Sequence, residues 1–431
     1  MKVVAFLPAK GSSERIENKN TRLLDGKPLF LHTLEKLVRC DFIDEVYLDS
    51  ESDQIFDLAS EVDCKHLKRD PALASNKTDG HALFFNEVKH VDADIYIQVL
   101  GTSPFIKPET IKHGIDILLN DPRYDSVVLV AKEKQYLWEG DQPKYDKFHI
   151  PNSKDLPDTI VESMGLYIVR REVAIKNKMR YGDHVCFIYA DATEKVDVNY
   201  PDEFVMANYL AAGIRERERK LFRNLSMVLT GSMLSDILDE LNIHGVINGL
   251  KPNLQDAKVL GRANTLKLRA LRDGENFMGI YDALRSYKTV VPGDIIVVEN
   301  ECSDYAYFGN LNASLAMRAG AVAAIINGKT RDFSAVKQLG FPVFADGYTC
   351  KDVLKRATVE SMNKTIKISG IAIRPGALIF ADNDGIVVIP EKYETTVLER
   401  AIQTVRKETG IIEKMVLGTE AVQILEEIGA F

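Results

Sequence analysis

The chain has 431 residues, 45% of them hydrophobic and 27% charged, a composition typical of a globular protein with roughly two or three domains. Its net charge of −8 argues against broad binding to nucleic acid or to a membrane surface, so any basic site must be local. The five cysteines are scattered without a CxxC pair, which favours a reducing cytoplasm and no zinc site, and no apolar run is long enough to predict a membrane span.

The chain opens with a predicted strand that leads into a loop with small and basic residues. Residues 3–7 are apolar and predict a buried strand, which ends at Pro8. Gly11, Ser12 and Ser13 follow, and small residues allow backbone N–H groups to approach an anion closely. Three basic side chains accompany them: Lys10, Arg15 and Lys19. The loop has neither the Walker nor the GxGxxG spacing, so it predicts a local phosphate site of another kind, with an ordinary surface turn as the alternative.

The rest of the first half alternates between amphipathic and apolar segments. Helices are expected at residues 30–38, 52–59, 79–88 and 108–119, and strands at residues 45–48, 95–100, 126–130 and 163–169. This alternation predicts an α/β domain with a mostly parallel sheet covered on both faces. Ligands of such sheets bind at the carboxyl ends of the strands, where the 7–20 loop, Glu51 and residues 101–104 are expected to meet.

Two segments interrupt this pattern. Residues 132–159 are polar and aromatic, and we interpret them as an insertion that covers the site or pairs with a second subunit. Asp197 and Asn199 then precede a helix that starts at Pro201. Oxygen-bearing side chains at positions i and i+2 of an extended segment point to one side and, together with nucleotide phosphates, could hold Mg²⁺. Helix capping is the alternative for this pair.

Seven motifs occur in an order that resembles the acylneuraminate (sialic acid) cytidylyltransferase family over about residues 1–215. They are LPAKGSSERIENKN at 7–20, DGKPL at 25–29, RDP at 69–71 with Leu73 and Ala74, Gln98 followed by TSP at 102–104, DLP at 155–157, GLYI at 165–168, and DVN at 197–199 with Asp202 and Phe204. The resemblance implies a Rossmann-like nucleotidyltransferase domain that attaches CMP from CTP to a 2-ulosonic acid and releases pyrophosphate. It also implies a dimer through the insertion.

The same resemblance implies roles for individual residues. The triphosphate would lie on the loop, with Lys10, Arg15 and Lys19 in catalytic positions and with nucleotide contacts from Pro8, Ala9, Gly11, Ser12, Asn20 and Arg69. The sugar acid would contact Gln98, Thr102 and Ser103. A Mg²⁺ or Mn²⁺ ion would be held by Asp197 and Asn199. Catalysis would then rest on positioning and charge rather than on a protein nucleophile.

Four positions depart from the family pattern. Lys10 replaces the usual loop arginine, Glu14 stands at a common basic position, and Phe105-Ile106 replaces the basic residue that often follows Thr-Ser-Pro. These three leave the acceptor open, including a non-sugar acceptor such as a phosphonate. Asn199 replaces the second metal aspartate and is a weaker, neutral ligand.

A mixed charge run at residues 215–220 is interpreted as a solvated helix face leading to a domain joint, which divides the chain into domains 1–222 and 223–431. The second half has short strands separated by Gly and Pro, which predicts an α/β swivel-type domain. Its strands are expected at residues 258–260, 265–271, 294–299, 321–327, 342–345, 365–373, 378–381 and 385–389, and its helices at residues 235–241, 281–286, 312–319 and 394–409.

Several motifs of this half resemble the family of 4-hydroxy-4-methyl-2-oxoglutarate aldolases and regulators of ribonuclease E activity, over about residues 228–412. They are VPGD at 291–294, Gly309 through Arg331-Asp332, LGFPVFA at 339–345, and PG at 375–376 with ADNDGIVVIP at 381–390. The resemblance implies a trimer or hexamer and a metal-dependent site for a 2-oxo acid. Arg331 would bind the carboxylate, Asp332 the metal ion, and the amides of Leu311 and Asn312 the substrate.

Two acidic positions of that family are Asn310 and Ala335 here. The retained Arg-Asp pair favours binding of a 2-oxo acid, and the lost carboxylates weaken the case for proton transfer. The second domain is therefore left open between a lyase and a non-catalytic scaffold or regulator, with modulation of a ribonuclease as a minor alternative.

Overall fold

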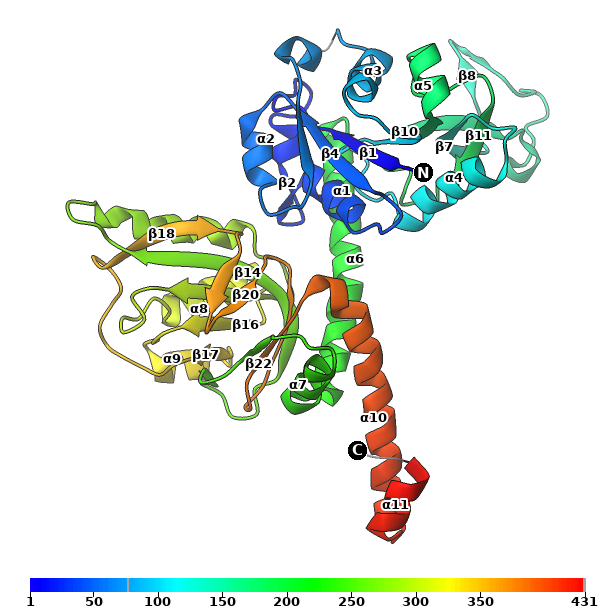
Figure 1. Cartoon of the computed structure of the whole chain (residues 1–431). Helices are drawn as coiled ribbons and strands as arrows, with labels where there is room; N and C mark the ends of the chain where they lie inside the picture. The colour runs from blue at the N-terminus through cyan, green and yellow to red at the C-terminus, as the bar shows by residue number, and fades with distance from the viewer. Residues whose placement is uncertain (76, 429–431) are drawn as a thin grey trace. The chain divides into compact units, whose positions relative to one another are not determined.

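The computed structural model describes residues 1–75 and 77–428 (Figure 1). The chain forms two compact units, Met1–Ala211 and Ala212–Phe431. The border between these units lies within one continuous helix, α6 (Pro201–Val228). The domain boundary predicted between residues 222 and 223 falls in the same helix, and it stays a prediction. In the described part of the chain, no helix has both the length and the apolar character that crossing a membrane requires.

The first unit is built on a seven-stranded sheet in the order β11-β7-β10-β6-β1-β4-β5. All its pairings are parallel except those of β10, which runs antiparallel to β6 and β7, so the predicted mostly parallel α/β sheet is confirmed. Its strands are β1 (Val3–Pro8), β4 (Glu45–Ser50), β5 (Lys65–Lys68), β6 (Ile95–Val99), β7 (Ser126–Glu133), β10 (Thr159–Arg170) and β11 (Val185–Tyr189).

Helices cover both faces of this sheet (Figure 1). One face buries the apolar sides of α1 (Leu29–Val38), α2 (Asp53–Leu58) and α4 (Pro108–Asn120). The other buries α3 (Gly80–His90) and α5 (Arg171–Asn177). On that second face the aromatic rings of Phe6, Phe84 and Tyr96 pack together, with Phe6 and Tyr96 stacked at a centroid distance of 6.0 Å. The apolar core thus lies below the carboxyl ends of the strands and leaves that edge to polar side chains.

The interrupting segment after β7 has little regular structure. It holds a short hairpin of β8 (Trp138–Glu139) and β9 (Gln142–Pro143), and the 3-10 turn η3 (Ser153–Asp155). Trp138 is 59% exposed and Phe148 is 82% exposed. Exposed aromatic side chains suit a surface that another molecule covers, and the interpretation as a lid or subunit contact stays a prediction.

The second unit contains a nine-stranded mixed sheet that confirms the predicted swivel-type α/β architecture. Its strands run in the order β12-β22-β21-β14-β15-β16-β17-β13, and β18 pairs with β14. They are β12 (Val246–Ile247), β13 (Lys251–Pro252), β14 (Val259–Ala270), β15 (Asp294–Asn300), β16 (Ala323–Asn327), β17 (Val343–Ala345), β18 (Ala357–Met362), β21 (Leu378–Ala381) and β22 (Ile386–Ile389).

Two strand predictions were wrong in this unit. The strands expected at residues 258–260 and 265–271 form the single strand β14, because a buried strand continues through the polar residues Arg262 and Asn264. The strand expected at 365–373 is instead a hairpin of β19 (Ile366–Ile368) and β20 (Ile371–Ile373). The φ angles are 50° at Ser369 and 82° at Gly370, and positive φ at both positions suits a tight two-residue turn.

Helices and 3-10 segments complete the second unit: α7 (Gly231–Glu240), η4 (Phe277–Lys288), α8 (Asn310–Ala319), α9 (Phe333–Gln338), α10 (Glu394–Val416) and α11 (Ala421–Ile428). The helix expected near residues 281–286 is thus a 3-10 segment. The charge run at residues 215–220 lies within α6 and not at its end, because α6 continues as far as Val228.

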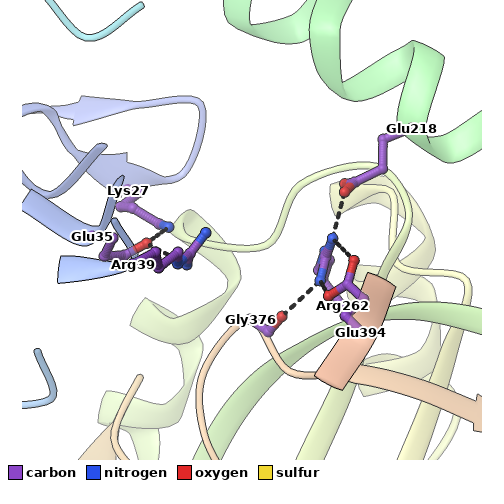
Figure 2. A network of polar contacts seen from close by, with 7 residues as sticks. All are labelled: Lys27, Glu35, Arg39, Glu218, Arg262, Gly376 and Glu394. Carbon is purple, nitrogen blue, oxygen red and sulfur yellow. Dashed lines mark hydrogen bonds and ion pairs between the residues drawn. The ribbon is translucent and has the colours of Figure 1, made fainter. Parts of the chain in front are cut away.

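Arg262 connects three elements of the second unit, as Figure 2 shows. Its guanidinium donates to Glu394 at the start of α10 with distances of 2.6 and 2.8 Å, and to Glu218 of α6 at 2.6 Å. Burial opposes its charge, but the two carboxylates raise the pKa of Arg262 overall. Since the arginine side chain is 25% exposed and the carboxylates are close to it, the ion pairs are only partly solvated.

We expect Arg262→Ala to lower the free energy of unfolding by about 2 kcal/mol, because two partly buried carboxylates lose their counter-ion. Urea denaturation followed by circular dichroism measures this loss. Arg285→Ala is the matched control, since the Arg285 side chain is 72% exposed and pairs with Asp282, which lies three positions before it in η4. An equal effect of both substitutions would contradict the role of Arg262.

Candidate functional site

The loop after β1 is attached to the end of the neighbouring strand β4. Ala9 N donates to Asp49 O at 2.9 Å, and Gly11 N donates to Glu51 Oε1 at 2.7 Å. A Cβ atom at position 11 would lie 2.6 Å from Ser52 Cβ, so only glycine allows this approach. The nucleotide-site candidates Pro8, Ala9, Gly11 and Ser12 therefore lie at the carboxyl edge of the sheet, where the sequence placed them.

Arg69 stabilises the attachment of the loop to β4. It is 5% exposed, and its guanidinium donates to Asp49 Oδ2 at 3.1 Å and to Glu51 Oε2 at 2.9 Å. Burial works against ionisation of Glu51, but the bonds from Gly11 and Arg69 lower its pKa overall. Arg69 thus fixes the Glu51 carboxylate, which in turn fixes the loop at Gly11. A direct contact of Arg69 with a nucleotide stays a prediction.

The predicted phosphate and metal residues lie close together at this edge. Lys19 Nζ donates to Val198 O at 2.9 Å and to Asn199 Oδ1 at 3.3 Å. Burial lowers the pKa of Lys19, Asp197 opposes that shift, and Arg15 and Lys10 lower the pKa further. These electrostatic effects place Asp197, Arg15 and Lys10 near Lys19, although Lys10 and Asp197 are 187 positions apart in the sequence.

Further contacts fix the backbone on both sides of this charge cluster. Val198 N donates to Thr102 O at 2.8 Å, and Ser103 Oγ lies 3.4 Å from Asp197 Oδ1. On the loop side, Asn20 Nδ2 donates to Lys10 O at 2.7 Å. The structure therefore brings together the loop, residues 102–103 after β6, and residues 197–199, as the resemblance implied.

Oxygen ligands for a divalent cation are present here but incomplete. Asp197 offers a carboxylate and Asn199 an amide oxygen, and the Asn199 Nδ2 group donates to Asp197 Oδ2. In the described ranges 1–75 and 77–428, no group of three or more His, Cys, Asp or Glu side chains could hold a metal ion. Mg²⁺ typically takes one or two carboxylates and completes its shell with water and substrate phosphates, so this donor set fits it.

Gln98 lies apart from the solvent-facing cluster. It is fully buried on β6, next to Phe6 of β1 and Tyr167 of β10 in the sheet register, and its Nε2 donates to Glu87 of α3. Its predicted contact with a sugar acid stays a prediction.

If the loop holds CTP, as the resemblance implies, Gly11→Ala is expected to raise the KM for CTP about tenfold, because the added Cβ pushes the loop away from Ser52 and misplaces its amides. Steady-state kinetics of pyrophosphate release measures this. Gly213→Ala is the control: no atom lies within 4 Å of its Cβ position, and alanine favours its helix. An unchanged KM in the Gly11 variant would show that the loop does not hold the nucleotide.

The second unit holds its own predicted site at the start of α8. Asn310 N donates to Asp332 Oδ2 at 3.1 Å, and Arg331 Nε lies 3.8 Å from that same oxygen. A Cβ atom at Gly309 would lie 2.6 Å from Asp332 Oδ2, so the glycine permits this close contact. A hollow of about 540 Å³ adjoins these groups, lined by Asn310, Leu311, Asp332, Phe333, Ser334 and Ala335.

Three residues predicted to bind the substrate in this second site have other contacts or are largely exposed. Arg331 Nη1 pairs with Asp352, so the arginine is already shared between two carboxylates. Leu311 is 77% exposed, and Asn312 Nδ2 donates back to Tyr307 O at 2.7 Å. The structure brings Arg331, Asp332 and the amide end of α8 together, while their roles toward a substrate stay predictions.

Sequence reasoning missed several residues of these sites. Asp49, Glu87 and Arg180 are buried polar residues of the first unit that no motif indicated, and Asp352 is the unforeseen partner of Arg331. Glu51 was expected at the sheet edge because it directly follows a strand, but its bond to the Gly11 amide was not. The one available signal was a carboxylate directly after the apolar residues of a predicted strand, as at Asp49.

Comparison with known proteins adds independent findings for the first half. The Cytidylyltransferase family model matches residues 4–139. The CMP-N,N'-diacetyllegionaminic acid synthase of Legionella pneumophila is 35% identical over 123 residues, 27% of this chain and 53% of that protein. The N-acylneuraminate cytidylyltransferase of Escherichia coli O18:K1:H7 is 23% identical over 236 residues, 52% of this chain and 55% of that protein. The chain thus spans about half the length of these relatives.

The second half has matches of a different kind. The Aldolase/RraA family model matches residues 233–388. A putative 4-hydroxy-4-methyl-2-oxoglutarate aldolase of Halalkalibacterium halodurans is 32% identical over 170 residues, which is 39% of this chain and 76% of that protein. The chain therefore belongs to the Aldolase/RraA family through its second half, and that half is fused to a cytidylyltransferase domain.

Proposed function

We propose that the N-terminal domain, residues 1–222, transfers CMP from CTP to the anomeric hydroxyl of a 2-ulosonic acid and releases pyrophosphate. The observation that carries this proposal is the gathering of Lys10, Arg15 and Asp197 around Lys19, whose Nζ contacts Val198 O and Asn199 Oδ1 at the carboxyl edge of the sheet. Positive charge beside a carboxylate suits a triphosphate and its divalent cation.

Each group would have a distinct part in the reaction. Gly11 N holds the loop on Glu51, so the loop amides that follow it, from Ser12 onward, would bind phosphate oxygens. The cationic side chains offset charge as the acceptor oxygen attacks the α-phosphorus. Asp197 and Asn199 would hold Mg²⁺, which when bound shields the charge of the phosphates. Lys19 Nζ lies 3.3 Å from Asn199 Oδ1, so a phosphate group bound beside the metal ion would also lie near Lys19.

Two acceptor classes remain in view. Curated relatives are named for legionaminic, N-acylneuraminic and 3-deoxy-manno-octulosonic acids, which favours a 2-ulosonic acid. The buried amide of Gln98, together with Thr102 and Ser103, offers hydrogen bonds that suit hydroxyl groups. A phosphonate is the alternative, because Phe105-Ile106 stand directly after Thr102-Ser103-Pro104, where a basic residue often recognises the sugar carboxylate.

The test is pyrophosphate release by the full-length protein with CTP, Mg²⁺ and one acceptor at a time. Sialic, legionaminic, pseudaminic and deoxy-octulosonic acids form the sugar panel, and methylphosphonate and 2-aminoethylphosphonate form the other. We expect pyrophosphate release only when CTP, Mg²⁺ and a sugar acid are all present. Release with UTP but not with CTP would contradict the proposal.

For the C-terminal domain, residues 223–431, we propose a site that binds a 2-oxo acid through Arg331 and Asp332. Asp332 lines a hollow of about 540 Å³, and Arg331 Nε lies 3.8 Å from its carboxylate, which supports this proposal. The open-chain form of a 2-ulosonic acid is itself a 4-hydroxy-2-oxo acid, so both domains could bind related carbon skeletons. The loss of acidic side chains at Asn310 and Ala335 favours binding or regulation over rapid cleavage.

Assembly into a homo-oligomer is part of the proposal. The exposed Trp138 and Phe148 of the first unit supply a surface for dimer contacts through the inserted segment. A trimer or hexamer through the second unit follows from the family resemblance. Mass photometry of the purified chain tests both.

A further inference from the structure

Five polar side chains form a buried cluster on the α3 face of the first sheet. Asp49, Glu87 and Gln98 are each 0% exposed, Arg69 is 5% exposed, and Arg180 is 6% exposed. They come from β4, α3, β6 and the segments after β5 and α5. Polar groups buried this deeply cost free energy unless each finds a partner, so their contacts identify what the cluster can bind.

The contacts form a chain that ends at the phosphate loop. Gln98 Nε2 donates to Glu87, whose carboxyl group lies close enough to that of Asp49 for each to affect the pKa of the other. Arg69 then links Asp49 to Glu51, which accepts from Gly11 N. The predicted acceptor residue Gln98 is thus connected through a continuous series of polar contacts to the loop proposed to hold CTP.

Four buried atoms have no hydrogen-bond partner among the described residues: Asp49 Oδ1, Glu87 Oε1, Gln98 Oε1 and Arg180 Nε. The first two belong to carboxyl groups that face each other, and one proton bound between them supplies the missing donor. With that proton in place, the guanidinium groups of Arg69 and Arg180 balance the charges of Asp49 and Glu51. The other two atoms, an acceptor on Gln98 and a donor on Arg180, still lack partners.

We propose that Glu87 is a positioning residue: it holds the Gln98 amide by its Nε2 group, so that Gln98 Oε1 is left to accept from a hydroxyl or amide N–H of the acceptor. Without Glu87, the Gln98 amide group is free to rotate, and its Nε2 donor then takes the position of the Oε1 acceptor. This inference rests on the proposed transfer of CMP, and it narrows the acceptor to a polyhydroxylated or N-acylated acid. A simple alkylphosphonate such as methylphosphonate offers neither an alcohol hydroxyl nor an amide N–H to Gln98 Oε1.

The groups that face Glu87 favour its neutral form. Burial is the largest cause that raises the pKa of Glu87 well above its ordinary value, and the charge of Asp49 raises it further, whereas Gln98 and Arg180 oppose the shift. Glutamine is therefore the conservative replacement: its amide can accept from Gln98 and donate to Asp49. Leucine keeps the volume but removes both contacts.

The direct test is NMR of full-length protein labelled with [¹⁵N]glutamine, with the Gln98 side-chain signal assigned by its absence in Gln98→Met. We expect slow hydrogen exchange of that NH₂ group in the wild type and in Glu87→Gln, and exchange at least tenfold faster in Glu87→Leu. Equal exchange in all three proteins would overturn the proposal. This readout needs no substrate, so it decides the role of Glu87 even if no acceptor is turned over.

Kinetics with the sugar acid of lowest KM in the acceptor panel test the functional part. We expect Glu87→Leu to raise the KM for that acid at least tenfold while the KM for CTP changes less than twofold, and Glu87→Gln to keep both near wild-type values. An equal rise in both KM values would indicate a structural role only and overturn the assignment. If the wild type turns over no acceptor while Gln98 exchange responds as expected, the proposed transfer fails and the positioning by Glu87 stands.

A pH series supplies a control when the leucine variant does not fold. A folded-state pKa above the unfolded value means that the native protein binds the extra proton, so the stability it contributes is present at low pH and is lost as the pH rises through that raised pKa. We expect the melting temperature of the wild type to fall with rising pH relative to that of Glu87→Gln, which has no such proton. Parallel melting curves across the pH range would overturn the shared proton and, with it, the fixed amide.

Discussion

Replacement of Asp197 by alanine is expected to lower the turnover number for metal-dependent pyrophosphate release about a thousandfold, since charge stabilisation by a bound metal ion contributes several kcal/mol. Asp197 is the sole carboxylate of the proposed metal pair, and Lys19, Ser103 and Asn199 all lie against it. The melting temperature should change little, because the substitution removes one carboxylate at the sheet edge and leaves the apolar core intact. Turnover at several Mg²⁺ concentrations, together with thermal melting, measures both quantities.

Asp63→Ala is the control for that substitution, because Asp63 is an exposed carboxylate in the turn before β5. Asn199→Asp offers the reverse experiment: a second carboxylate should tighten Mg²⁺ binding and lower the concentration needed for half-maximal rate. If Asp197→Ala kept its Mg²⁺ dependence and rate, the metal assignment would be refuted, whatever the acceptor.

Arg331→Ala is expected to lower Mg²⁺-dependent pyruvate release from oxaloacetate by the full-length protein about a hundredfold, because a bidentate grip on the 2-oxo acid carboxylate is lost. Arg331 lies beside Asp332, which accepts from Asn310 N at the start of α8, and the proposed 2-oxo acid site is built on these groups. Coupling to lactate dehydrogenase measures pyruvate, with a protein-free blank at the same Mg²⁺ concentration.

Arg318→Ala provides the comparison, since Arg318 is an exposed arginine at the other end of α8. A wild-type rate equal to the blank would exclude this lyase reaction and leave the second domain as a binding or scaffold module. Pyruvate release that survives in Arg331→Ala would instead move the reaction to another site.

Local patterns predicted the first unit well. Strong periodicity and flanking Pro or Ser residues placed α1, α3, α4 and β6 within a few residues of their observed ends. The 7–20 loop, Glu51 and residues 101–104 were expected at the carboxyl edge of the sheet, and the structure has them there, with Val198 bonded to Lys19 and Thr102. These predictions succeeded because strand polarity follows from the alternation of strands and helices, and polarity alone decides which loops share an edge.

The second unit was harder to predict from local patterns. β14 was divided into two strands because Arg262 and Asn264 suggested a break, yet Arg262 is compensated by Glu218 and Glu394 from distant parts of the chain. The strand expected at 365–373 ignored the turn at Ser369-Gly370. In both cases the deciding interaction was a partner or a backbone angle that a single sequence does not display.

The sequence by itself determined the order of strands and helices, the two family resemblances, and the residue types of the phosphate loop, because each depends on neighbours along the chain. Only the tertiary structure decided that Arg69 serves Glu51 and the loop, that Asp352 shares Arg331, and that Glu87 and Asp49 stand behind Gln98. The physical reason is the same in each case: a buried charge or amide must find its partner, and that partner can come from any strand or helix that the fold brings within hydrogen-bonding distance.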